Sequence, residues 1–147
     1  MKNTLNLLTL AGVICAGLLT AAAAEKKIEA GPKGGRILDK TSPKVEFYVE
    51  KDRSVTIAFY DANLKPVSPA DQSVTVIADA KDGKAKIEFE KKGDVLVSKT
   101  KLPEADGYNV VVQFKQTDAK PQNFRFTLDL HTCGGCKRAE YACTCDH

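Results

Sequence analysis

Residues 131–147 hold four of the five cysteines and both histidines of this 147-residue chain. The cysteines form two close pairs, Cys133-Gly-Gly-Cys136 and Cys143-Thr-Cys145. Side chains of these types, gathered in one short segment, can ligate a soft metal ion, form disulfides or carry out thiol redox chemistry. The C-terminal tail is therefore the part of the chain where we expect chemistry.

The spacing within the tail suits one metal ion. Glycines between Cys133 and Cys136 permit a turn with positive φ, in which backbone N–H groups point at the sulfurs. In an extended segment, residues i and i+2 place the thiols of Cys143 and Cys145 on the same face. Thiolates favour zinc or monovalent copper. The predicted metal ligands are Cys133, Cys136, Cys143 and Cys145, with His131 or His147 able to replace one of them.

Two other kinds of chemistry remain open for the same residues. Four cysteines are an even number, so two disulfides could instead staple the tail into an interaction module without a ligand. Bridges between the two pairs would be easier than one inside Cys143-Thr-Cys145, which would close a small strained ring. A C-x-x-C after a strand, followed by Lys137 and Arg138, could also serve a thiol-disulfide oxidoreductase. That class, however, normally sets its motif in a βαβ unit, which this sequence lacks.

The first 24 residues have the features of a secretory signal peptide. Lys2 precedes an uncharged stretch at residues 5–19, and alanines occupy positions 21–24. This order of a basic start, an apolar stretch and small residues predicts cleavage after Ala24. We therefore expect a periplasmic or secreted protein without stable membrane insertion after processing. Removal of the leader would change the formal net charge from +3 to +2, and this mixed charge gives no case for a nucleic-acid partner.

Residues 25–34 are predicted to be a linker, and residues 35–130 to be one β-domain. Apolar residues recur at every second position in several short segments, separated by polar turns. These segments centre on residues 45–49, 55–59, 74–78, 87–89, 95–97, 110–114 and 124–130. The pattern predicts an all-β fold, an antiparallel β-sandwich of about seven to eight strands, with a partly open barrel as the alternative. The charged residues between the apolar ones, Glu46 included, are expected on a solvated face.

The tail at residues 131–147 is expected to be a separable appendage. The alternating apolar pattern ends at Leu130, and Tyr141 is the only large apolar residue beyond it. The order of the tail would then come from a metal ion or from bridges. No nucleophile–base pair, phosphate-binding glycine loop or paired carboxylates occur in the chain, so we expect no catalytic residues and no enzyme, apart from the thiol redox alternative.

Most of residues 31–130 resembles a known bacterial family. The segment Gly31-Pro-Lys-Gly-Gly-Arg-Ile37, a strand at residues 45–50 and the segment Val55–Val67, which ends in Tyr-Asp-Ala-Asn-Leu-Lys-Pro-Val, carry the resemblance. They resemble a small exported β-domain that occurs alone or beside heavy-metal efflux adaptor proteins. Members often have histidine in the entry turn, where this chain has Lys33. The resemblance implies a role in envelope metal handling and a heavy-metal efflux component as a partner.

Overall fold

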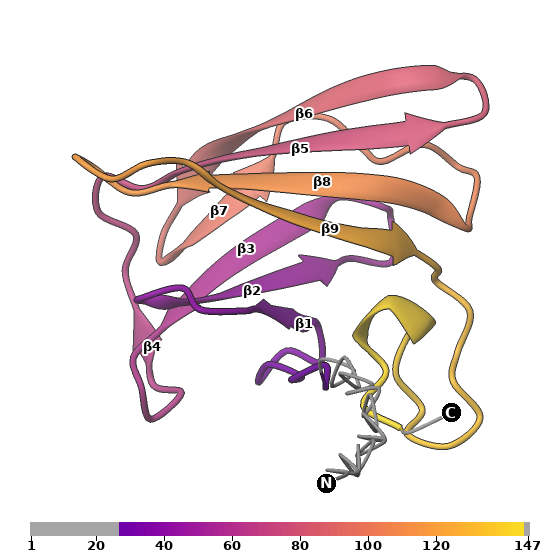
Figure 1. Ribbon diagram of the computed structural model, residues 1–147, viewed down its shortest axis with the longest axis horizontal. Coiled ribbons are helices and arrows are strands. Elements are labelled where there is room, and N and C mark those ends of the chain that lie inside the picture. Colours follow the sequence, from indigo (N-terminus) through magenta and orange to yellow (C-terminus); the bar gives the residue numbers. More distant parts are fainter. Residues whose placement is uncertain (1–26, 146–147) are drawn as a thin grey trace, which may run out of the picture.

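A computed structural model describes residues 27–145 as an all-β, antiparallel protein with almost no helix (Figure 1). Its elements are β1 (Arg36–Leu38), β2 (Lys44–Val49), β3 (Val55–Tyr60), β4 (Pro66–Val67), β5 (Ser73–Ala80), β6 (Gly83–Lys92), β7 (Val95–Ser98), β8 (Tyr108–Lys115), β9 (Gln122–Leu128) and the 3-10 helix η1 (Glu140–Ala142). The predicted fold class is confirmed. The predicted leader at residues 1–24 and the candidate ligand His147 lie outside the described residues.

The sheet is continuous and bent back on itself. Its strand order is β1-β2-β3-β7-β6-β5-β8-β9, with β4 paired to β3. Strand β6 makes the bend, because residues 83–88 pair with β5 whereas residues 89–92 pair with β7. The layer with β1, β2 and β3 therefore faces the layer with β5, β8 and β9 (Figure 1). The two layers of the predicted sandwich are parts of one nearly closed sheet, whose ends are the edge strands β1 and β9.

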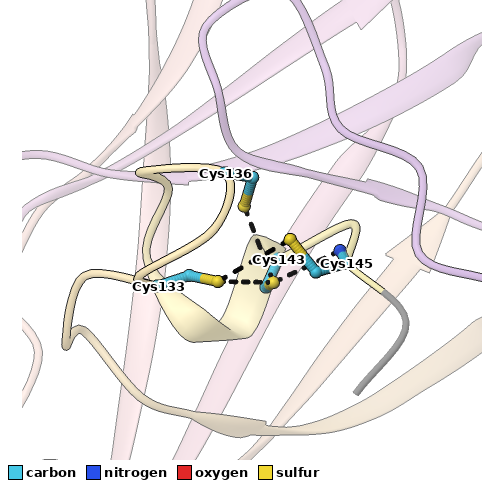
Figure 2. Close-up of side chains that lie close together, drawn as sticks. All are labelled: Cys133, Cys136, Cys143 and Cys145. Carbon is cyan, nitrogen blue, oxygen red and sulfur yellow. Dashed lines mark hydrogen bonds between the residues drawn. The ribbon is translucent and has the colours of Figure 1, made fainter.

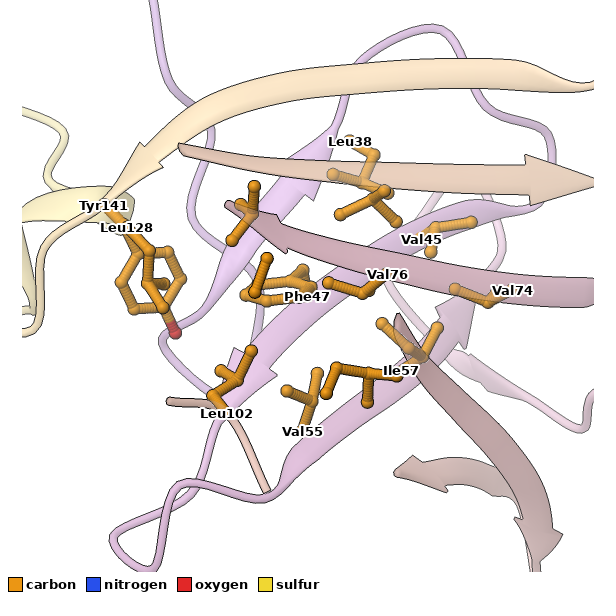
Figure 3. Packing of buried hydrophobic residues seen from close by; sticks show 14 of the residues in the cluster. Leu38, Val45, Phe47, Val55, Ile57, Val74, Val76, Leu102, Leu128 and Tyr141 are labelled. Carbon is orange, nitrogen blue, oxygen red and sulfur yellow. The ribbon is translucent and has the colours of Figure 1, made fainter. Parts of the chain in front are cut away.

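Alternating side chains from both layers fill the space between them (Figure 3). In β8, the residues at alternate positions 108, 110, 112 and 114 are buried and their neighbours are not, as period-two alternation predicts. Val76 of β5, Val110 of β8 and Phe47 of β2 are completely buried. Phe47 also meets Phe126 of β9 in an edge-to-face contact with ring centroids 5.4 Å apart. This contact joins the two edge regions of the bent sheet.

The alternation fails on β3, and the prediction of a solvated outer face there is wrong. All six residues of β3 are buried. Ala58 and Tyr60 form a second small apolar cluster with Ile37 of β1. Glu46 on β2, predicted to face solvent, is 0% exposed. The reason is tertiary, because the entry segment at residues 31–35 folds over Glu46. Ile37, Leu64 and Val95 pack against Ala58 and Tyr60.

Glu46 is the anchor of that entry segment. Its carboxyl oxygens accept hydrogen bonds from the backbone N–H of Gly35 at 2.8 Å and of Lys33 at 3.3 Å, and from the Tyr60 hydroxyl at 2.7 Å. A Cβ on Gly31 would overlap the carboxyl group, at 2.5 Å from each oxygen. The glycine at position 31 is therefore required by the close approach of backbone to a buried side chain. Burial in turn raises the pKa of Tyr60, and its hydrogen bond to Glu46 adds to the shift.

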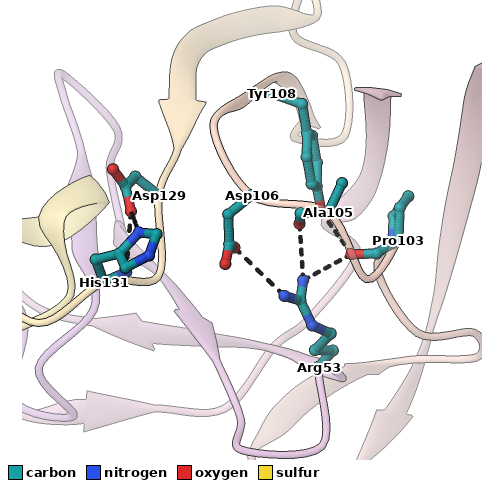
Figure 4. Close-up of polar contacts among 7 residues, drawn as sticks. All are labelled: Arg53, Pro103, Ala105, Asp106, Tyr108, Asp129 and His131. Carbon is teal, nitrogen blue, oxygen red and sulfur yellow. Dashed lines mark hydrogen bonds and ion pairs between the residues drawn. The ribbon is translucent and has the colours of Figure 1, made fainter. Parts of the chain in front are cut away.

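Arg53, in the turn between β2 and β3, holds the loop between β7 and β8 in place. Its guanidinium donates to the carbonyl oxygens of Pro103 at 2.6 Å and Ala105 at 3.0 Å, and pairs with Asp106 at 3.4 Å (Figure 4). The carbonyl oxygen of Arg53 accepts the N–H of Leu102 at 2.9 Å, which places the Leu102 side chain in the core. These contacts close the end of the sheet from which the tail departs.

Candidate metal centre

The tail begins as a short hairpin that continues β9. The N–H of Tyr141 donates to the carbonyl oxygen of Asp129 at 3.1 Å, and the N–H of Cys133 to that of Arg138 at 2.7 Å. Thr132 and Ala139 form an antiparallel bridge between these bonds. Cys133 and Cys136 therefore lie in the hairpin loop, and η1 then carries the chain back toward them with Cys143 and Cys145.

This folding brings the four predicted cysteine ligands into one cluster (Figure 2). Their Sγ atoms all lie within 4.8 Å of one another, so the cluster could hold a metal ion. The Sγ of Cys143 lies 3.0 Å from that of Cys133 and 3.6 Å from that of Cys136, and Cys133 and Cys145 are 3.9 Å apart. Four thiolates around an ion with bonds near 2.3 Å would be separated by about 3.8 Å. Two of these three separations are close to that value, so the four sulfurs could surround one ion.

The sulfurs are not bonded in pairs. None of the four cysteines of the described segment forms a disulfide. A disulfide needs an S–S separation of about 2.05 Å, well below the shortest separation of 3.0 Å found here. Cys133 and Cys143 are buried, whereas Cys136 and Cys145 are half-exposed. One side of the cluster therefore faces the protein and the other faces solvent.

His131 is placed differently from the cysteines. Its Nδ1 lies 2.7 Å from the Asp129 carboxylate, and its side chain is 76% exposed (Figure 4). The hydrogen bond to Asp129 and its negative charge raise the pKa of His131. The group of ligand atoms within 4.8 Å contains the four cysteines and not His131. The structure therefore groups four of the six predicted ligands, with His147 outside the described residues.

The turn between the first two cysteines differs in detail from the predicted one. The positive φ falls on Lys137, at 61°, and not on the two glycines. Gly135 is needed for another reason, since a Cβ there would lie 2.8 Å from the Sγ of Cys145. Lys137 also donates from Nζ to the carbonyl oxygen of Gly134 at 2.8 Å, which holds the turn closed.

The thiols differ in acidity for identifiable reasons. Backbone N–H groups of Arg138 and Thr144 stabilise the Cys136 thiolate and lower its pKa to about 5. The hydrogen bond to Cys133 raises the pKa of Cys143 to about 12. The hydrogen bond from Cys143 lowers the pKa of Cys145, but burial and the neighbouring thiols of Cys136 and Cys133 outweigh it and the net shift is upward. One thiol of the cluster is therefore ready to ligate at neutral pH, while others keep their protons.

These shifts predict that metal affinity rises with pH. At pH 7 the thiols of Cys143 and Cys145, whose pKa values are raised, must lose their protons to a metal ion. We expect the logarithm of the zinc association constant to increase by about 2 or more per pH unit between pH 6 and 8. Competition with a chromophoric chelator at a series of pH values measures this slope. An affinity that is flat over this range would contradict it.

The two glycines of the turn provide a matched pair of variants. Gly135→Ala should displace Cys145, because the new Cβ would meet its Sγ at 2.8 Å. We expect zinc affinity to fall by about 10–100-fold, the size of effect that misplaced ligand-supporting groups produce. At Gly134 a new Cβ would meet no atom within 4 Å, and the backbone φ is not left-handed. Gly134→Ala should therefore bind zinc nearly as tightly as the unmodified chain. Equal affinities for both variants would show that Cys145 is not a ligand.

The expectation that the tail contributes almost nothing to the core is wrong. Tyr141 is 4% and Ala142 0% exposed, and both belong to the main hydrophobic core. The Tyr141 ring packs edge-on against Phe47, with centroids 5.8 Å apart, and stacks on Phe126 at 6.3 Å. Sequence periodicity misses this contact because a single aromatic residue in a three-residue helix has no repeating pattern. Figure 3 shows Tyr141 at one end of the group of core residues that it draws.

Comparison with protein-family models, with curated proteins and with solved structures finds no match to this chain. Within residues 27–145 no helix is long and apolar enough to cross a membrane. The fold and the geometry of the cysteine cluster are therefore the observations on which a functional proposal rests.

Proposed function

We propose that this protein is a non-enzymatic metal-binding protein that holds one zinc or monovalent copper ion through Cys133, Cys136, Cys143 and Cys145. The observation that carries the proposal is the gathering of four cysteine sulfurs, none of them in a disulfide, within 4.8 Å of one another. Soft thiolate donors select these two ions, and four of them suit tetrahedral zinc. A divalent ion with four thiolates carries a net charge near −2, which Lys137 and Arg138 beside the cluster would offset.

The cellular setting is the second half of the proposal. The leader-like residues 1–24 support export. The resemblance of most of residues 31–130 to a domain found alone or beside heavy-metal efflux adaptors supports a role in the bacterial envelope. A heavy-metal efflux component is the partner that this setting implies. Mass spectrometry of the protein from its own compartment tests processing, and we expect a chain that begins at Glu25. A chain that retains Met1–Ala24 would refute export by cleavage.

Elemental analysis combined with a free-thiol count tests the metal proposal. The full protein, purified without chelators, should contain one ion per chain and no reactive thiol in the tail. Treatment with a strong chelator should then release four reactive thiols. Two disulfides and no metal would instead support a stapled interaction module.

One observation favours a second candidate function. The pKa of Cys136, lowered to about 5 by backbone N–H groups, makes this half-exposed sulfur a thiolate at neutral pH. Such a thiolate can attack a disulfide. Reduction of a test disulfide that is lost in Cys136→Ser would support an oxidoreductase. Absence of turnover in the metal-free protein would exclude this candidate.

A further inference from the structure

Tyr141 connects the cysteine cluster to the open ends of the sheet. It lies in the chain between Cys136 and Cys143, yet its ring points away from the sulfurs and into the core. The cluster and the buried ring are therefore opposite sides of one short segment. A change in the order of that segment must affect both.

The ring occupies the place where β1 stops covering β2. Strand β1 pairs with β2 only at Val45, Glu46 and Phe47. Farther along β2, the N–H of Val49 donates to the Tyr141 hydroxyl at 3.0 Å. The hydroxyl thus satisfies an edge donor that no β1 residue reaches. Burial holds the pKa of Tyr141 at about 12, so the hydroxyl stays protonated.

The same residue also contacts both end strands of the sheet. In the described part of the chain, β1 and β9 are the ends of the strand order and do not pair with each other. Arg36 of β1 stacks on Phe126 of β9 with its guanidinium carbon 4.7 Å from the ring centroid. Its Nη1 also donates to the carbonyl oxygen of Tyr141 at 3.4 Å. Tyr141 therefore holds β1, β2 and β9 together at one end of the open seam.

The local structure of this segment is weak by itself. Helix η1 has three residues and no side-chain cap, and such a short helix has no intrinsic stability. Lys137 adopts φ of 61°, which is unfavourable for a residue with a side chain. Four thiols are crowded around a common centre. A bound ion would supply the free energy that keeps this arrangement folded, because ligation of a flexible segment is coupled to its folding.

We propose that ion occupancy of the four cysteines controls the docking of Tyr141 on the β1–β9 seam. This inference rests on the proposed function and adds regulation to it. The loaded protein has the seam closed and Val49 bonded to Tyr141. The ion-free protein releases Tyr141 and leaves the Val49 edge and the faces of Phe47 and Phe126 accessible. Metal availability would then change the shape of the sheet edge. Such a change suits a metal sensor better than a metal-storage protein.

Because coupling between two events is reciprocal, the proposal can also be tested by changing Tyr141 and measuring zinc affinity. If the ion favours docking, docking must favour the ion by the same factor. Tyr141→Ala should therefore weaken zinc binding by about 5–150-fold, although Tyr141 is not among the ligands. Tyr141→Phe keeps the ring and loses only the hydroxyl bonded to Val49, so its effect should be smaller. Tyr108→Phe is the matched control, since it removes the hydroxyl of another buried tyrosine, one that bonds to the carbonyl oxygen of Pro103 at 3.3 Å and not to Val49.

The experiment uses the full chain and two readouts. Zinc affinities of the four proteins are measured by chelator competition, and exchange of the Val49 amide proton is followed by NMR with and without zinc. We expect the native chain and Tyr108→Phe to bind zinc with equal affinity, Tyr141→Phe to bind it more weakly and Tyr141→Ala to bind it most weakly. We also expect the Val49 amide proton to exchange more slowly when zinc is present.

The outcomes separate the two proposals. Two results would overturn the coupling and leave the metal site intact. In the first, all variants bind zinc with the same affinity as the native chain. In the second, the native chain binds zinc but its Val49 exchange is unchanged by the ion. A native chain that binds neither zinc nor monovalent copper would overturn both. Should Tyr141→Ala fail to fold, Tyr141→Phe and the Val49 exchange of the native chain still decide.

Discussion

Serine at both Cys133 and Cys143 is expected to abolish stoichiometric zinc binding. These are the two buried sulfurs of the cluster, 3.0 Å apart, and their loss leaves only the half-exposed Cys136 and Cys145. Two thiolates cannot complete a tetrahedral site. Chelator competition should show one bound ion in the native chain and none in the variant.

The same variant should also lose thermal stability in the presence of zinc. A ligand present at a thousandfold its dissociation constant stabilises the state that binds it by about 4 kcal/mol. In a domain of this size that corresponds to roughly 10–20 °C in the unfolding midpoint. The shift requires the tail to unfold together with the domain, as the burial of Tyr141 and Ala142 in the main core indicates. An unchanged midpoint would show that the tail opens independently.

His131→Ala is the control for the ligand assignment. His131 belongs to the tail and to a ligand residue type, but its ring is exposed and bonded to Asp129. We expect this variant to bind zinc as tightly as the native chain. Loss of binding in His131→Ala would show that the histidine completes the site and that one of the cysteines does not.

The largest effect outside the tail is expected for Gly31→Ala. The new Cβ would overlap the Glu46 carboxyl group, at 2.5 Å from its oxygens, and must displace either the entry segment or the glutamate. In both cases Glu46 loses backbone partners in a site where it is 0% exposed. A buried polar group left without a partner costs about 1–3 kcal/mol. With more than one group affected, we expect a loss of about 3 kcal/mol or more in the free energy of unfolding, measured by urea denaturation.

A double-mutant cycle separates this collision from a simple backbone effect. Glu46→Ala removes the atoms that the new Cβ would meet, so Gly31→Ala should cost much less in that background than in the native one. Gly34→Ala is the control, with φ of 90° and open space around the new Cβ. It should lose only about 1–2 kcal/mol, the strain of a side chain in a left-handed conformation. Additive effects at positions 31 and 46 would disprove the contact.

Local sequence patterns were sufficient to predict the all-β architecture and the four cysteines that form the cluster. Alternation of apolar residues with period two determines which residues of β5 and β8 face inward, because successive side chains of a strand point to opposite faces. The tail brings its own four sulfurs together because Cys133 and Cys145 lie in a hairpin loop and its returning arm, within one short stretch of chain. Both results depend on residues near one another in the sequence.

Tertiary structure alone decided that Glu46 and Tyr141 are buried. Glu46 follows the solvent phase of its strand, and the entry segment at residues 31–35 covers it by contributing backbone N–H donors. Tyr141 belongs to no alternating apolar pattern, and it is buried because its ring packs against Phe47 and Phe126 of two strands distant in the sequence. The hydrophobic pattern of a strand indicates which of its faces points to the core. It does not indicate whether a segment distant in the sequence covers the other face. The burial of both residues therefore emerges only when segments far apart in the sequence are packed together.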